Sequence, residues 1–293
     1  SSGGNTGSHS ASSRYDRIDN YSFVTDGNAT DWGDLVRDTY MMAGTASATH
    51  GYVGRGEFAT NNLVDTIQKF SFAAQADATD VGNATTAGTR GSGHSDGTNG
   101  YFCYVVGWPI TTNAVDKFAF ASDGDASDVG NINMNLAPYG GCSSLTHGYN
   151  VSDSGSNSGA FSGNINQFSF ASPATATDVG DILFTMENAG NSMSATHGYI
   201  SGGHIGGQPG INTIQKFSFV SLGNSTDVGD LQQNKGHTPA CSSSTTHNYN
   251  AGGWMGEQNP SNVIEKWSTS TDANATDVGD LWAVNYGCVG AQV

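Results

Sequence analysis

The stretch Thr226-Asp227-Val228-Gly229-Asp230-Leu231 decides the fold of this chain, because its central tripeptide recurs along all 293 residues. The tripeptide Asp-Val-Gly, which is Asp-Trp-Gly in the first copy, begins at six positions: Asp31, Asp80, Asp128, Asp178, Asp227 and Asp277. Successive copies begin 48 to 50 residues apart. A repeat of this length with short strand-like runs and turn residues is typical of β-propellers and not of helical solenoids. The sequence therefore predicts six blades.

One unit, residues 192–231, divides at its turn residues into four short strands. The pair His197-Gly198 indicates a tight hairpin turn between the first two strands. The second strand, residues 199–201, ends at a pair of glycines. Residues 214–219 alternate apolar and polar side chains with one slip in register, which predicts a third strand with a bulge. Residues 226–231 form the fourth strand, and its Val and Leu are expected to pack between blades.

The third strand carries aromatic residues in every unit, and we expect these to form the core. Burying a side chain of this size contributes roughly 1.5–3 kcal/mol, so packing is a better explanation than ligand contact. The residues concerned are Tyr21, Phe23, Phe70, Phe72, Phe118, Phe120, Phe168, Phe170, Phe217, Phe219 and Trp267.

The two ends of the chain supply complementary parts of one blade. Residues 2–4 match the end of a second strand, so the first blade lacks its first strand. Residues 286–293 align with a first strand, so we expect the C-terminal segment to complete the N-terminal blade and remove exposed sheet edges. The prediction is an all-β, six-bladed β-propeller with four-stranded blades and one domain, 1–293. Part of the expected second strand is missing between the two ends, as in an excised part of a longer chain.

Histidines recur at the expected hairpin turns: His50, His147, His197 and His247. Equivalent turns of adjacent blades are expected to lie too far apart for ligands that approach a zinc ion to about 2.0–2.1 Å. We therefore expect turn or inter-blade hydrogen bonds, no metal and no cofactor. The acidic turn around Asp123, Asp125 and Asp128 offers oxygen ligands for calcium but lacks the glutamate and spacing of a full calcium loop.

Composition excludes several partner classes. A net charge of -16 with only ten Lys and Arg argues against nucleic acid, whose binding depends on basic side chains. No apolar run reaches the eighteen or so residues of a membrane span, so no membrane insertion is expected. The four cysteines, Cys103, Cys142, Cys241 and Cys288, show neither a disulfide framework nor a metal motif.

Five segments match the glycosylation pattern, beginning at Asn28, Asn83, Asn150, Asn224 and Asn274. Most of them fall in the same repeated turn. Asn, Ser and Thr are favoured there because their side chains cap turns. We expect turn chemistry to explain these residues better than a secretory signal does.

The order of turn, apolar strand with two glycines, loop, aromatic strand and Asp-Trp-Gly-Asp-Leu resembles the kelch repeat. Tyr199-Ile-Ser-Gly-Gly203 and Asn250-Ala-Gly-Gly253 match its double glycine, and Trp32 matches its later Trp. Val replaces that Trp in five units, and the double glycine is absent after Tyr52, Tyr101 and Tyr149. The near-identical copies are also similar to propeller repeats in marine bacteriophage virion proteins, including tail-fibre and appendage proteins. This second resemblance implies a virion or extracellular location.

No catalytic constellation stands apart from the repeat, so we expect a non-enzymatic protein. Some kelch-like propellers are copper oxidases of sugars, but here Tyr and His recur in every blade and no unit concentrates them. The segments that vary between units are the loops between strands two and three and the blade-to-blade connections. The candidate ligand-binding residues in the former loops are Phe58, Trp108, Phe161, His204 and Trp254; Tyr40, Met41, Met42, Tyr139 and Trp282 lie near the latter.

Aromatic rings beside amides suit carbohydrate, although Trp108 and Trp254 taken singly also suit gap-filling between blades. The leading hypothesis is an adhesion or receptor-binding module of a phage virion that recognises a host cell-surface glycan or protein. The alternatives are a structural appendage or decoration subunit that contacts other virion subunits, and a secreted kelch-like lectin.

Overall fold

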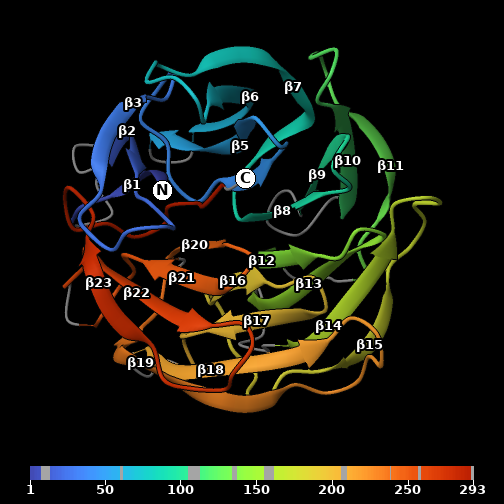
Figure 1. Ribbon diagram of the computed structural model, residues 1–293. Helices are drawn as coiled ribbons and strands as arrows, with labels where there is room; N and C mark the ends of the chain where they lie inside the picture. The colour runs from blue at the N-terminus through green and yellow to red at the C-terminus, as the bar shows by residue number, and fades with distance from the viewer. Residues whose placement is uncertain are drawn as a thin grey trace.

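The chain forms six antiparallel sheets arranged around a central axis, as seen end-on in the computed structural model (Figure 1). The structure describes residues 1–7, 14–59, 62–104, 113–133, 137–154, 162–205, 210–237, 239–256 and 259–291. All regular elements within these residues are β-strands. The prediction of an all-β, six-bladed propeller is confirmed.

Blades two to six each contain four strands in chain order, with the first strand nearest the axis. Blade two comprises β4 (Ala43–Ala46), β5 (His50–Ala59), β6 (Asn62–Ser71) and β7 (Thr79–Gly88). Blade three comprises β8 (Gly91–Ser95), β9 (Asn99–Tyr104), β10 (Ala114–Ala119) and β11 (Ser127–Asn131). Blade four comprises β12 (Ala137–Ser143), β13 (His147–Ser154), β14 (Ser162–Ser169) and β15 (Thr177–Asp181). Blade five comprises β16 (Gly190–Met193), β17 (His197–Ser201), β18 (Ile211–Ser218) and β19 (Thr226–Lys235). Blade six comprises β20 (Ala240–Ser243), β21 (His247–Ala251), β22 (Val263–Ser268) and β23 (Thr276–Asp280).

Blade one is assembled from both ends of the chain. Its own strands are β1 (Ser2–Asn5), β2 (Arg14–Asn20) and β3 (Thr30–Asp34). The C-terminal segment supplies the innermost position, because Ser2 N–H donates to the Val289 carbonyl at 3.0 Å and Asn5 N–H donates to the Tyr286 carbonyl at 2.9 Å. The predicted closure of the ring by a C-terminal strand is confirmed.

The Asp-Val-Gly motif joins each blade to the next. Its glycine lies at a β-bulge that recurs between the third and fourth strands of all six blades, such as the one between Ile214 and Gln215. A Cβ on Gly229 would lie 2.5 Å from the Ala273 carbonyl oxygen of the next blade. The residue directly after this glycine accepts a backbone hydrogen bond across the same interface; Ala275 N–H, for example, donates to the Asp230 carbonyl at 2.8 Å. The same inter-blade contact recurs around the ring, which explains why the Asp-Val-Gly motif recurs in the sequence.

Three asparagines of the glycosylation pattern take part in the same inter-blade contact. The Oδ1 atoms of Asn28, Asn224 and Asn274 each accept a backbone N–H from the preceding blade at 3.1 Å. Their side chains therefore have a structural role in the turn.

Aromatic residues fill the space between blades, as the sequence predicts. A tyrosine of the second strand stacks on an aromatic residue just beyond the third strand of the next blade. The ring centroids are 4.7 Å apart for Tyr52 and Phe120, and again for Tyr249 and Phe23, where blade six meets blade one. The same contact therefore also closes the ring.

The hairpin turn lies earlier than the sequence suggests. His197 and Gly198 belong to β17 and pair with β18, whereas the turn is formed by the three preceding residues. Ser194 N–H donates to the His197 carbonyl at 2.8 Å. The imidazole Nδ1 of His197 lies 2.8 Å from the hydroxyl of Thr196, and the other three recurrent histidines make the same contact. The Ser-x-Thr turn, not the His-Gly pair, reverses the chain.

The four cysteines are free thiols; Cys142 lies on β12 and Cys241 on β20, in different blades. A search of the described residues finds no helix that is long and apolar enough to span a membrane.

Candidate functional site

The loops between strands two and three and the blade-to-blade connections lie on one face of the propeller, here termed the loop face. The remaining turns lie on the opposite face, here termed the turn face. Six of the exposed large apolar residues belong to the loop face: Val36, Leu63, Leu183, Phe184, Trp282 and Val284. Val24, Leu145 and Val220 belong to the turn face. Among the described residues, more of the exposed large apolar side chains therefore lie on the loop face, and the three on the turn face are individually more exposed.

Two of the five predicted site residues, Trp108 and Phe161, lie outside the described residues. Phe58 is half-buried on β5, and the guanidinium carbon of Arg37 lies 5.0 Å from its ring centroid. Among the residues predicted near the connections, Tyr40, Met41 and Met42 are buried.

His204 and Trp254, which are predicted from neighbouring units, come close together on the loop face. His237 lies between them, with ring centroids 4.5 Å from His204 and 5.6 Å from Trp254. Tyr286 completes the cluster 4.8 Å from Trp254. Trp254 is only 8% exposed, so its ring packs between blades in this structure. Sequence reasoning missed His237 and Tyr286 as members of this cluster, because their approach to His204 and Trp254 depends on how neighbouring blades pack.

Trp282 is the most exposed aromatic residue among the described residues, at 66%. It lies on the connection from blade six to blade one. The Arg17 guanidinium carbon lies 4.9 Å from the indole centroid, and Arg17 Nε lies 3.8 Å from Asp31 Oδ2. These three residues, here termed the Trp282 platform, place a flat apolar ring beside a hydrogen-bond donor and an acceptor.

The platform could be only partly identified from the sequence. Trp282 is evident as a large residue in a variable connection. Asp31 belongs to the Asp-Val-Gly repeat and so does not stand out in the sequence, and the contact of Arg17 on β2 with Trp282 depends on ring closure. The contact with Arg17 holds the ring over blade one, and a cation stacked on indole contributes about 0.5–1 kcal/mol at exposed sites.

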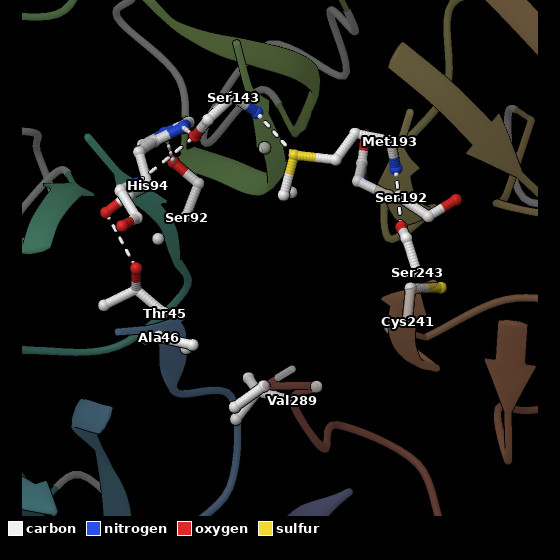
Figure 2. Close-up of a pocket in the computed structure, with 18 of the residues that line it drawn as sticks. Thr45, Ala46, Ser92, His94, Ser143, Ser192, Met193, Cys241, Ser243 and Val289 are labelled. Carbon is white, nitrogen blue, oxygen red and sulfur yellow. Dashed lines mark hydrogen bonds between the residues drawn. The ribbon is translucent and has the colours of Figure 1, made fainter. Parts of the chain in front are cut away.

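A central channel of about 310 Å³ runs along the propeller axis. Figure 2 shows Thr45, Ser92, His94 and Ser143 on one side of it and Met193, Ser243 and Cys241 on the other, with Val289 of the C-terminal segment between the two groups. The lining is supplied by the innermost strands of all six blades.

Polar groups of the channel mainly bond neighbouring strands to one another. Thr45 Oγ1 donates to the His94 carbonyl at 2.8 Å, and Met193 N–H donates to Ser243 Oγ at 2.9 Å. None of the described lining residues is Asp, Glu, Lys or Arg. Because several of the hydroxyls are engaged in strand contacts and fixed charges are missing from the described lining, the channel is a weaker candidate site than the loop face.

A polar side chain occupies the bulge position of every blade: Asp19, Gln68, Asp116, Asn166, Gln215 or Glu265. In four blades it accepts a backbone N–H from the fourth strand of the preceding blade or from the connection that follows that strand, as Gln68 Oε1 does from Val36 at 2.6 Å. Two of the buried acids have a buried cationic side chain nearby. Arg55 lies near Asp116, and its guanidinium stacks on Tyr104; Lys235 contacts Glu265.

Among the described residues, no group of three or more His, Cys, Asp or Glu side chains is arranged to hold a metal ion. In the acidic turn considered for calcium, Asp123 pairs with Lys69 at 2.9 Å and Asp125 accepts from Asn83 N–H at 2.9 Å. These carboxylates bridge blades two and three.

No protein-family model matches this chain, and no curated protein matches it.

Proposed function

We propose that this chain is a non-enzymatic adhesion or receptor-binding module of a phage virion, which recognises a host cell-surface glycan or protein through its loop face. A β-propeller fits a binding module, because nearly identical blades form a rigid scaffold for loops that differ. The virion location follows from the resemblance of the repeats.

The observation that carries the proposal is the Trp282 platform. An indole ring that is 66% exposed and held by Arg17 offers an apolar surface for a sugar ring. The Arg17 guanidinium and the Asp31 carboxylate beside it can donate to and accept from hydroxyl groups. A pre-positioned ring loses little side-chain freedom on binding.

The first prediction tests this face with labelled protein and intact bacterial cells. Trp282→Ala should weaken saturable binding at least about tenfold, since a Trp anchor at an interface typically contributes about 2 kcal/mol or more. Trp282→Phe should retain part of the affinity. Surface polysaccharides extracted from the same cells should compete.

The matched control is Leu145→Ala, which removes an 88% exposed apolar side chain from the turn face. This variant should bind as the wild type does. An equal loss of cell binding in Trp282→Ala and Leu145→Ala would argue against a site on the loop face. No binding by the wild type to any host of a broad panel would favour a structural virion subunit.

A further inference from the structure

Lys235 and Glu265 form an ion pair in which both side chains are 0% exposed. Lys235 is the last residue of β19 in blade five, and Glu265 lies on β22 in blade six. The Lys235 Nζ lies 2.6 Å from Glu265 Oε2 and donates to the Val263 carbonyl at 3.1 Å. The other carboxylate oxygen, Oε1, accepts Gln232 N–H at 2.5 Å. The pair therefore spans two blades in a site closed to water.

A buried carboxamide completes this group. Asn250 lies on β21 directly opposite Glu265 in the strand register, and side chains of such cross-strand neighbours meet on one face of a sheet. Its Oδ1 lies 3.5 Å from Lys235 Nζ, and its Nδ2 donates to Ser201 Oγ at 2.9 Å. An amine, a carboxylate and a carboxamide thus converge between blades five and six.

The combination of amine, carboxylate and carboxamide does not recur at the blade interfaces compared below. The residues that align with Lys235 in four other connections are Thr39, Gly88, Met186 and Asn285, none of which has an amine. The other buried side-chain cation beside a bulge acid is Arg55, whose guanidinium stays protonated and is a poor nucleophile. Within the described residues, Lys235 is the buried amine that faces an amide carbon.

We propose that Lys235 and Asn250 join in an intramolecular isopeptide bond that links blade five covalently to blade six. In a site of low polarity, the ion pair becomes neutral when a proton passes from Nζ to the Glu265 carboxylate. The free amine then attacks Cγ of Asn250, which is bonded to the Oδ1 atom that Nζ already contacts. Because the fold already holds the Lys235 amine beside the Asn250 carboxamide, the reaction does not pay the entropy cost of bringing two separate reactants together.

Atoms and charges balance without an oxidant or another reactant. The Nζ–Cγ bond forms and the Cγ–Nδ2 bond breaks. Of the two protons that Nζ loses, one leaves with Nδ2 as ammonia and the other stays on Glu265. The products are a secondary amide, ammonia and a neutral carboxylic acid, so no unpaired charge remains buried.

The bond would lie beside the loop face. Lys235 directly precedes Gly236 and His237, and Gly236 pairs with Trp254. A covalent link would therefore fix the connection that carries part of the aromatic cluster. It depends only on the buried group and not on the function proposed above.

The second prediction is tested by mass spectrometry of the full purified chain under denaturing conditions. The intact mass should be lower by one ammonia. Trypsin should not cleave after Lys235, because the modified side chain no longer carries a charge, and it should release residues 217–266 as one peptide. Chymotrypsin cleavage after Tyr249 should then leave residues 232–249 attached to residues 250–254.

Two variants serve as controls. Lys235→Arg removes the primary amine and should show the full mass with no linked peptide. Glu265→Gln keeps the amine and the carboxamide but removes the proton acceptor, and should also stay unlinked. Because removing one partner of a buried pair destabilises the fold, Lys235→Met combined with Glu265→Gln provides a variant without buried charge.

Mass spectrometry of the wild-type chain is sufficient to test the proposed bond. A full intact mass together with separate tryptic peptides 217–235 and 236–266 would overturn the proposal. A loss of ammonia with normal cleavage after Lys235 would also overturn it, because the loss would then come from another residue.

Discussion

His94 illustrates how a single residue ties stability to pH in this propeller. Its ring is enclosed between blades three and four, with Nδ1 donating to the Cys142 carbonyl at 3.1 Å and Nε2 lying 3.0 Å from the Asn150 carboxamide. Ser92 and Ser143 supply nearby hydroxyls, and Phe168 packs edge-on at 5.2 Å. These contacts of His94 include no charged side chain. Burial therefore lowers the pKa of His94 to about 4.

The third prediction follows from this pKa. A histidine whose folded-state pKa lies below its unfolded value of about 6.5 stabilises the fold above that value, and the contribution is lost as the pH falls toward 4. The expected loss is about 3 kcal/mol. Urea unfolding at pH 7, 5.5 and 4 measures it. His94→Gln should be less stable at pH 7 but should show a flatter dependence between pH 7 and 4; a parallel dependence would contradict this account.

Sequence reasoning at the residue scale succeeded where a residue repeats and was limited where it does not. The recurrent aromatic residues and asparagines have the packing and turn roles expected of them. Lys235, Asn250 and Glu265 gave no signal, because their meeting depends on strand register and on which blades are neighbours. Burial of Trp254 agrees with the gap-filling role that the sequence analysis considered for it, although a tryptophan in a variable loop looks the same in sequence whether it faces solvent or a neighbouring blade.

At the scale of strands and turns, the glycine of the Asp-Val-Gly motif sets how closely two blades approach. Gly279 has φ +152°, and a Cβ there would lie 2.3 Å from the Gly27 carbonyl oxygen. Gly27 itself has φ +155°, yet a Cβ on it would meet nothing within 4 Å. These two residues have nearly the same backbone strain and differ in the inter-blade contact.

The fourth prediction uses this matched pair. Both Gly279→Ala and Gly27→Ala incur the strain of an unfavourable φ, of order 1–3 kcal/mol. Gly279→Ala should lose further stability because blades six and one must separate to admit the methyl group. Thermal unfolding of the two variants gives the comparison. Equal melting temperatures would mean that the inter-blade approach does not require glycine.

The turn between strands one and two shows why element boundaries were harder to predict than elements. A His-Gly pair between two apolar runs favours a two-residue turn by composition alone. The structure instead uses the preceding Ser-x-Thr segment, where Ser194 Oγ accepts His197 N–H at 3.1 Å. Hydrogen bonds from serine and threonine side chains stabilise this turn, so it does not need the glycine of a tighter turn. Because Ser and Thr have the same role in ordinary loops, they do not mark a hairpin turn in the sequence.

For the whole molecule, the number of blades and the closure of the ring were predictable because both follow from the period and from which strand is missing at each end. The central channel was not, since most of its lining is Gly, Ser, Thr and Ala, which does not distinguish these strands from others in the sequence. A ring of nearly equal blades has no terminal edge once Val289 pairs with Ser2 and Tyr286 with Asn5. Stability of the whole propeller should therefore depend on a few residues at the C-terminal end.

The fifth prediction concerns this closure. Deleting residues 286–293 removes the innermost strand of blade one, including Tyr286, whose hydroxyl donates to the Gly7 carbonyl at 2.9 Å, and Cys288, which packs in the core with Ala240 and Leu281. The exposed edge of β1 would offer unpaired backbone groups to other chains. The shortened protein should melt at a clearly lower temperature and form larger assemblies in light scattering.

Deleting only residues 292–293 is the control, because this change leaves the pairs made by Tyr286 and Val289 intact. Adding a peptide of residues 286–293 to the shortened protein should restore part of the stability, as ligands that bind only the folded state do. A shortened chain that stays monomeric and melts with the wild type would show that blade one is held by its three N-terminal strands alone.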